Sequence, residues 1–339
     1  MTAWVQVFKS QVYGQIIESD IQLPGFQPYS HELFRTESTN CPPQTVKLTC
    51  EAIEHVEPSL RNYLIPQKAA TGVGLYRINR QPNVLFGCSP RLGDYKLSSA
   101  AVQLNPVADL PFQHLLSFAL GSGLGVQLYL RNIIPMHGMA FLNPDSTASL
   151  VFGVSGAGKS TLTAACIQAG IPVFSDDILP IQQIDGNIYI HPAHRRLKLN
   201  SALITELNNT MTTNKGSQLI VDSAYPGTDK TGWIAPTQSF AQKPTRITQL
   251  FFLKKIRQPH QGKLGNILSP FQTMHVLRRC VYRPRLIPFL GLNKTFFAQA
   301  SLLSQLAPLR QLYLPHLNEY LSFQDYAEHI KALLQNDAW

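Results

Sequence analysis

The 339-residue chain has few charged residues, no close pair of cysteines and no long apolar run. Charged residues make up 14% of the chain and apolar residues 44%, a balance that excludes a disordered or fibrous protein. The five cysteines show no metal-ligand spacing, and their odd number predicts unpaired thiols in a reducing compartment. The sequence therefore predicts a folded, globular protein of the cytoplasm.

No segment is expected to enter a membrane. The opening MTAWVQVFKSQVYGQ lacks the basic start and continuous apolar run of a signal peptide. The most apolar region, Leu115 to Leu130, is interrupted by glycines and polar residues, and it falls short of the roughly 20 apolar residues that span a bilayer. It is predicted to form a buried helix.

The formal net charge of +9 favours encounters with anions but names no partner. Arg278, Arg279, Arg283 and Arg285 alternate with apolar residues, and they predict a solvated or domain-packing strand. Because no aromatic-interleaved nucleic-acid motif accompanies them, a nucleic-acid partner is not expected.

The pattern of apolar and turn residues changes near residue 105, where we place a domain boundary. Before it, segments such as TVKLTCE, VGLYRI and VLFGC predict short strands between turns, which indicates a smaller, mostly β N-terminal domain over residues 1–105. Residues 106–339 are predicted to form the catalytic domain, beginning with a helix over 111–120 and a glycine-rich SGLG connection.

The centre of the chain predicts a right-handed βαβ unit. Apolar strands are expected over 149–153 and 171–175, and a helix over 159–169. Gly170 and Pro172 mark the end of that helix. Further predictions are a hairpin turn at Asp185-Gly186-Asn187, a polar loop over 208–216, a strand over 246–254, and helices over 296–306 and 323–334.

One segment matches a phosphate-binding loop at every fixed position. Residues 153–160 read GVSGAGKS, which fits G-x-x-x-x-G-K-[ST]. Glycines let the backbone N–H groups approach phosphate oxygens, a lysine supplies charge, and a serine hydroxyl can ligate Mg²⁺. The alternative, a glycine-rich surface turn, leaves the complete pattern unexplained. The predicted nucleotide-binding residues are Gly153, Ser155, Gly156, Ala157, Gly158, Lys159, Ser160 and Thr161.

Two adjacent carboxylates, Asp176 and Asp177, follow the second strand of this unit and are expected at the carboxyl edge of the sheet. One can hold Mg²⁺ while the other takes the proton of an attacking hydroxyl. Neighbouring side chains of extended backbone point in opposite directions, so the two carboxylates are expected to take different roles. We assign Asp176 as the base and Asp177, with Ser160, as metal ligands, and the reverse assignment of the aspartates stays open. The alternative is an acidic pair that opens a turn or caps a helix.

Together these residues resemble the catalytic domain of HPr kinase/phosphorylase and related kinases. The matching elements are GVSGAGKST (153–161), FSDDI (174–178) and MHGMAFL (136–142), the last being similar to the family's LHG or LHA element. Two further segments, VYGQIIESDIQLPGF (12–26) and FFAQASLLSQLAPLRQLYL (296–314), resemble the branch that includes lasso peptide kinases.

This resemblance implies an α/β fold with a phosphate-loop kinase domain of the HPr kinase C-terminal type. It implies transfer of the γ-phosphoryl group of ATP to a hydroxyl, with Asp176, Lys159 and His137 as catalytic residues. For His137 the alternative is a structural histidine beside an apolar strand.

One element of the family has no counterpart here. The Glu-Val-Arg-Gly-Leu-Gly type signature of bifunctional HPr kinases is missing, and its region reads HPAHRRLKL (191–199). The resemblance therefore implies kinase chemistry on an acceptor other than HPr. Cations of this region and of a later turn are candidates for phosphate or acceptor contacts, against the alternative of a solvated face. They are His194, Arg195, Arg196, Lys198 and Lys230.

The sequence thus predicts an Mg²⁺- and ATP-dependent kinase that phosphorylates an alcohol. The expected acceptor is a serine or threonine of a peptide or small protein, including the C-terminal serine of a ribosomal peptide precursor. A sugar or polyol kinase and a nucleotide-dependent binding module remain open alternatives, and so does a homo-oligomer. The role of the N-terminal domain is not assigned.

Overall fold

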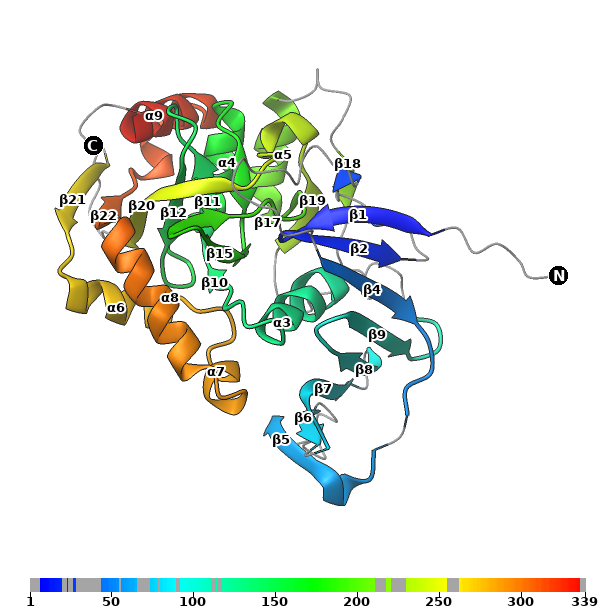
Figure 1. Ribbon diagram of the computed structural model, residues 1–339. Helices are drawn as coiled ribbons and strands as arrows, with labels where there is room; N and C mark the ends of the chain where they lie inside the picture. Colours follow the sequence, from blue (N-terminus) through cyan, green and yellow to red (C-terminus); the bar gives the residue numbers. More distant parts are fainter. Residues whose placement is uncertain are drawn as a thin grey trace.

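Two large β-sheets and a set of helices make up the computed structural model, which has a mixed α/β fold (Figure 1). The structure describes residues 7–19, 23, 27–28, 44–54, 56–65, 74–78, 80–89, 92–110, 114, 118–210, 218–220, 230–254 and 262–335. Among these residues, no helix combines the length and apolarity that a membrane crossing requires. Four of the cysteines, at positions 50, 88, 166 and 280, are free thiols.

The N-terminal segment, up to Pro106, forms a nine-stranded sheet in the order β3-β1-β2-β4-β9-β8-β7-β6-β5. The pairs β2–β4 and β4–β9 are parallel, and the other neighbours are antiparallel. The strands predicted at TVKLTCE, VGLYRI and VLFGC are confirmed as β4, β6 and β7. The strands are β1 (Phe8–Val12), β2 (Gln15–Ser19), β3 (Gln27–Pro28), β4 (Gln44–Cys50), β5 (Arg61–Ile65), β6 (Gly74–Ile78), β7 (Gln81–Ser89), β8 (Gly93–Leu97) and β9 (Ala101–Pro106).

The second large sheet leads into residues 153–160, the predicted phosphate loop. In it β12, β20 and β22 pair in parallel, and β11 lies antiparallel between β12 and β13. The strands β13, β12, β20 and β22 therefore all run in one direction and end at one edge. The β15–β16 hairpin pairs with the beginning of β20, and β21 borders β22. The strands are β11 (Met139–Leu142), β12 (Ala148–Phe152), β13 (Val173–Ser175), β15 (Ile181–Ile184), β16 (Asn187–Ile190), β20 (Thr245–Lys254), β21 (Lys263–Ile267) and β22 (Leu309–Tyr313).

The predicted strand, helix and strand around the phosphate loop are present. β12 leads into the loop, α4 (Lys159–Gln168) follows it, and β13 returns beside β11. The helix ends where predicted, because Gly170 has a φ of 74° and its N–H donates to the carbonyl of Ile167 while that of Ile171 donates to Cys166. This turn lets β13 deliver the residues after Ser175 to the edge at which the loop lies.

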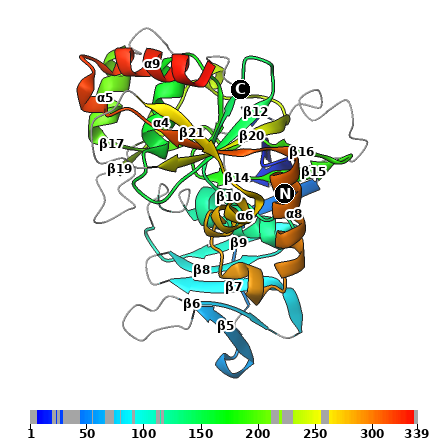
Figure 2. The same cartoon turned by 90° about the vertical axis from the view of Figure 1, so that its left-hand side faces the viewer.

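Helices cover both faces of the second sheet (Figures 1 and 2). Phe251 and Leu253 pack in one hydrophobic cluster with α4 and α9, whereas Leu250 and Phe252 pack in another with α6 and α8. Strand residues alternate between the faces, so a continuous apolar run is buried on both sides. The remaining helices are α3 (Leu124–Tyr129), α5 (Ser201–Thr210), α6 (Pro270–Arg279), α7 (Leu286–Phe289), α8 (Asn293–Leu306) and α9 (Phe323–Gln335), with short 3-10 turns at Pro58–Leu60, Thr237–Ser239 and Leu317–Glu319.

Two small sheets complete the described elements. β10 (Met136–His137) pairs antiparallel with β14 (Ile178–Leu179). β17 (Arg196–Asn200), β19 (Lys230–Ile234) and β18 (Gln218–Ile220) form a three-stranded sheet in the order β17-β19-β18. The helices predicted over 296–306 and 323–334, the strand over 246–254 and the turn at Asp185-Gly186 are all confirmed.

Two predicted connections are wrong because buried apolar residues continue the helices there. The SGLG segment is helical, since a π-helical turn (Phe118–Gly123) leads directly into α3, whose six residues are all buried. Of the helix predicted over 111–120, residues 111–113 and 115–117 lie outside the described part. Residues 208–210 of the polar loop predicted over 208–216 are helical instead, because Leu203, Ile204 and Leu207 are buried at helical spacing and α5 runs to Thr210. Residues 211–217 lie outside the described residues.

The strand predicted from the spaced arginines is also wrong. Ser269 and Gln272 form a reciprocal capping box with Pro270 in the first turn, and these residues start α6. Arg278 and Arg279 therefore end a helix, and Arg283 and Arg285 lie in the turn before α7.

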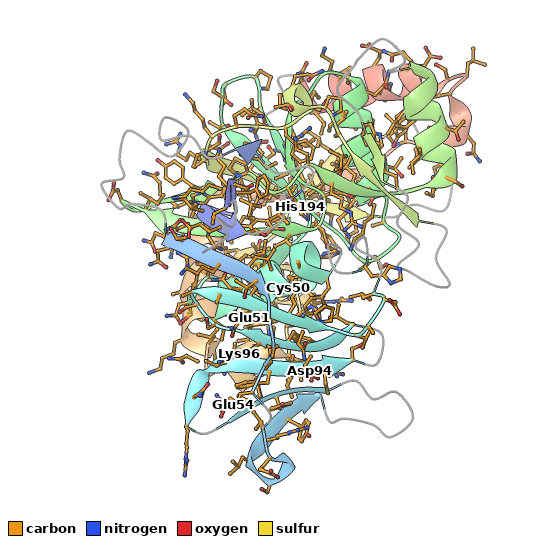
Figure 3. All side chains as sticks on the ribbon, turned by 90° about the vertical axis from the view of Figure 1, so that its right-hand side faces the viewer. Cys50, Glu51, Glu54, Asp94, Lys96 and His194 are labelled. Atoms are coloured by element: carbon orange, nitrogen blue, oxygen red, sulfur yellow. The ribbon has the colours of Figure 1, made fainter. Side chains whose placement is uncertain are left out.

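The tip of the β1–β2 hairpin contacts the segment that connects β16 to β17. Tyr13 is buried, and its N–H donates to the carbonyl of Pro192 at 2.9 Å. A single hydrophobic cluster includes Val12 and Ile190. In Figure 1 the rest of this sheet extends away from the hairpin to β5. Figure 3 shows Cys50, Glu51, Lys96, Asp94 and Glu54 along that sheet, away from His194. The division into domains 1–105 and 106–339 remains a prediction.

Candidate phosphate-binding and catalytic site

The loop over 153–160 has the backbone conformation that its glycines suggest. Gly156 and Gly158 have φ angles of 74° and 103°, in the left-handed region that only glycine adopts without strain. Gly158 is also the N-cap of α4, so the positive end of that helix points into the loop. The loop is therefore a concave arrangement of backbone around a helix N-terminus, which is suited to an anion.

Lys159 is buried within this loop. Its Nζ donates to the carbonyls of Gly153 at 2.7 Å and Val154 at 3.3 Å, and 7% of the residue is exposed. A buried ammonium group at the helix N-terminus gives the loop a concentrated positive charge.

A cavity of about 380 Å³ joins the loop to the acidic pair and to a basic strand. Eleven of the predicted site residues line it, and so does Lys198, which was predicted as a neighbouring cation. This convergence is the main feature of the site. The eleven are His137, Ser155, Gly156, Gly158, Lys159, Ser160, Thr161, Asp176, Asp177, His194 and Arg196. Six of them belong to the segment 153–161.

The two carboxylates have different partners, as the alternation of side chains predicted. Thr163 Oγ1 donates to Asp176 Oδ1 at 2.7 Å. Thr163 lies three residues after Ser160 on α4, and residues at this spacing share a helix face, so Asp176 lies on the side of Ser160. Asp177 instead contacts His137, with 2.9 Å between Oδ1 and Nδ1, and its Oδ2 lies 3.7 Å from Lys198 Nζ.

The charges around Asp177 keep it ionised. Partial burial raises the pKa of this carboxyl, but the hydrogen bond from His137 and the charge of Lys198 outweigh burial and hold the pKa at about 2. Burial lowers the pKa of His194 to about 4, and Arg196 and Lys198 add to this effect. At neutral pH the cavity thus contains an ionised carboxylate and a neutral histidine beside fixed cations.

Some predicted residues do not line this cavity. Arg195 immediately precedes β17, and its guanidinium donates to the carbonyl of Ala235. Ala157 serves the loop itself, its N–H donating to Val154 at 3.1 Å. Gly153 lines a neighbouring cavity. The side chain of Lys230 lies outside the described part of the structure, although its backbone begins β19 opposite Asn200.

The sequence analysis missed several contributors. Gly121, Asn200 and Leu203 line the cavity, and Thr163 orients Asp176. Only Thr163 had a local signal, its spacing of three residues from Ser160 on a predicted helix.

The residues fit a hard divalent cation such as Mg²⁺. A serine hydroxyl and two carboxylates supply oxygen ligands, and Mg²⁺ commonly takes one or two carboxylates and completes its shell with phosphate oxygens and water. Within the described residues there is no group of three or more histidine, cysteine or acidic side chains that could enclose a metal. The donor set therefore suits an ion brought with a phosphate ligand rather than a closed protein site.

Comparison with known proteins finds distant similarity among solved structures. No protein-family model matches the chain, and no curated protein matches its sequence. Among solved structures it is similar to the HPr(Ser) kinase/phosphatase from Coxiella burnetii, at 14% identity, covering 58% of this chain and 95% of that chain, with a TM-score of 0.26. A similarity this distant gives no information on the activity or the acceptor of this chain.

Proposed function

We propose that the chain is a kinase that uses Mg²⁺ and ATP to phosphorylate a hydroxyl, with a serine or threonine of a peptide or small protein as the acceptor. The observation that carries this proposal is the cavity in which the phosphate loop, Lys159, both aspartates and His137 meet. A nucleotide-binding module needs the loop, but it does not need a carboxylate-oriented histidine beside it.

The loop and its cations would bind the triphosphate of ATP. Backbone N–H groups and Lys159 would contact the β- and γ-phosphates, and Arg196 and Lys198 also line the cavity. Ser160 and Asp176 would hold Mg²⁺, which supplies positive charge against the phosphates in the transition state. In phosphoryl transfer, positioning and charge stabilisation provide most of the catalysis.

The partners of the aspartates favour the reverse of the roles assigned from sequence. Asp176 is on the side of Ser160 and suits the metal, whereas Asp177 accepts a hydrogen bond from His137 Nδ1. In this arrangement His137 Nε2 is the atom available to take a proton, and Asp177 fixes the tautomer and stabilises the imidazolium.

The proposed reaction is a direct transfer of the γ-phosphoryl group from ATP to the acceptor hydroxyl. His137 Nε2 takes the proton of the acceptor hydroxyl as its oxygen bonds to the γ-phosphorus, and the bond from that phosphorus to the β,γ-bridging oxygen breaks. ADP leaves with the electron pair of that bond. The proton on His137 is afterwards released to solvent.

Transfer of labelled phosphate tests this function. The protein is incubated with Mg²⁺ and γ-labelled ATP, with serine and threonine peptides or with a panel of sugars and polyols, and every component is analysed by mass spectrometry. The expected result is one added phosphate on a peptide, lost in Lys159→Ala.

The other results separate the alternatives. Phosphate on a polyol but on no peptide would indicate a small-molecule kinase. Tight ATP binding without transfer to any acceptor would indicate a nucleotide-dependent binding module and contradict the proposal.

A further inference from the structure

A second cavity, of about 610 Å³, opens beside the phosphate loop between the second sheet and α6. Its walls come from three separate parts of the chain. Phe252 and Lys254 belong to β20, Gln311 to β22, and Phe271, His275 and Arg279 to α6. It meets the phosphate cavity at His137 and Ser155, which line both.

Its position relative to the loop suits the acceptor rather than the nucleotide. The second cavity touches only the beginning of the loop, Gly153 to Ser155, whereas Ser160 and Thr161 line the first. In phosphoryl transfer the attacking and leaving oxygens lie roughly in line on opposite sides of the phosphorus. Two cavities that meet at the proposed base give the nucleotide one side and the acceptor the other.

The lining side chains of the second cavity that carry a fixed charge are positive. Lys254 and Arg279 line it, and none of the described residues in its lining is an aspartate or glutamate. Within the described residues, neither Lys254 nor Arg279 forms a salt bridge. The Lys254 ammonium lies 5.3 Å from the ring centroid of Phe252. Cations that lack a carboxylate partner next to a reaction centre can bind a carboxylate of the ligand.

The cavity also has an exposed apolar wall. Phe271 is 84% exposed at the beginning of α6, and Leu268 and Val276 lie close by in the lining. An aromatic side chain left in water beside a cavity offers a contact for an apolar side chain of a ligand.

We propose that this cavity binds the acceptor next to its hydroxyl, and that it selects a peptide with a carboxylate and a large apolar side chain close to the phosphorylated residue. The proposal rests on the kinase function above. An acidic side chain and a C-terminal carboxylate supply the same chemistry, and the experiment distinguishes these two sources.

The probes are short fluorescent peptides with one serine beside a leucine. In one series glutamate, glutamine or lysine follows the serine in the interior of the peptide, and in the other the serine lies next to a C-terminus that is a free acid or an amide. Binding to the full-length protein with a non-hydrolysable ATP analogue is measured by anisotropy, and transfer is measured separately with ATP. The peptides with a carboxylate in at least one series should bind about tenfold more tightly than their neutral counterparts.

Substitutions of the cavity residues test whether this cavity causes the preference for a carboxylate. Arg279→Gln and Lys254→Gln should each reduce the preference for a carboxylate several-fold, and Arg279→Glu should shift it toward the lysine peptide. Phe271→Ala should weaken binding of the leucine peptides relative to alanine versions. Arg285→Gln and Phe297→Ala are matched controls at exposed positions outside the cavity, and they should change neither preference.

The binding measurement tests the acceptor site, and the transfer measurement tests the kinase function, so the two proposals can be contradicted independently. If the wild-type protein prefers peptides with a carboxylate and the Arg279 variants lose this preference, the acceptor site is supported, even without phosphorylation. The absence of phosphate transfer to any peptide would contradict only the proposal that the protein is a peptide kinase. Equal binding of acidic and neutral peptides in both series, or equal losses in the controls, would overturn the acceptor site, whether or not transfer occurs.

Discussion

His137 Nδ1 lies 2.9 Å from Asp177 Oδ1, and the backbone around this pair holds the two residues together. His137 is opposite Ile178 in the β10–β14 ladder, and the N–H of Gly138 donates to the carbonyl of Asp177 at 3.1 Å. A Cβ at Gly138 would lie 2.6 Å from the carbonyl oxygen of Val151, so only glycine fits after this histidine. The pair is thus fixed by backbone pairing, and its side chains can be replaced without removing these backbone hydrogen bonds.

The first prediction concerns the division of roles between the aspartates. His137→Gln and Asp177→Asn should both lower the rate of phosphoryl transfer, His137→Gln by about 10²- to 10⁴-fold because the proton acceptor is lost. Asp176→Asn should instead raise the Mg²⁺ concentration needed for half-maximal rate. The measurement is the transfer rate as a function of pH and of Mg²⁺ in each variant.

The pH profile separates a base from a structural histidine. His137→Gln should remove the acidic limb of the rate profile, which a merely structural role would not do. If Asp176→Asn loses that limb while His137→Gln keeps it, Asp176 is the base, as the sequence analysis assigned it.

Local patterns predicted much of the site, because its core is one continuous segment. The phosphate loop, the end of α4 at Gly170 and the hairpin turn at Asp185-Gly186 each follow from a few adjacent residues with particular backbone requirements. The partners of the aspartates do not follow in this way. His137 reaches Asp177 through a pairing between strands about 40 residues apart in the sequence, which no local pattern encodes.

The second cavity was beyond sequence reasoning for the same reason. Its cations come from β20 and α6, which meet only when the sheet and the helices pack. Arg278 and Arg279 were predicted to lie on a strand because arginines and apolar residues alternate there. The local signal of the helix is the capping box of Ser269 and Gln272, which the sequence analysis missed.

A second prediction tests the contact between the N-terminal hairpin and the site. Gly14 and Gly186 both occupy hairpin turns, with φ angles of 72° and 77°. A Cβ at Gly14 would lie 2.7 Å from His191 Nδ1, whereas a Cβ at Gly186 would meet nothing within 4 Å. Alanine at Gly186 should therefore cost about 1–2 kcal/mol of unfolding free energy from backbone strain alone, and alanine at Gly14 about 1–3 kcal/mol more.

Denaturant unfolding of the two variants measures this difference, with Gly186→Ala as the control for backbone strain. The transfer rate should fall in Gly14→Ala, since His191 precedes the segment that carries His194 and Arg196 into the phosphate cavity. Equal losses of stability in the two variants would show that the hairpin does not press on His191.

The last prediction concerns acid sensitivity. Burial, assisted by the charge of Arg131, lowers the pKa of His191 from 6.5 to about 4. The unfolded chain therefore binds more protons than the folded protein between pH 4 and 6.5, so the stabilisation is complete above pH 6.5 and is lost as the pH falls toward 4. Within this window His191 should contribute a slope of about 1.4 kcal/mol per pH unit to the free energy of unfolding.

Denaturant titrations at several pH values between 4.5 and 6.5 measure that slope. His191→Gln should reduce it by about 1.4 kcal/mol per pH unit, because the buried titrating group is gone. The control, His275→Gln, replaces a histidine on the exposed surface of α6. Since only His191 is enclosed against Gly14, the two variants should differ, and an equal change of slope in both would mean that folding does not keep His191 neutral.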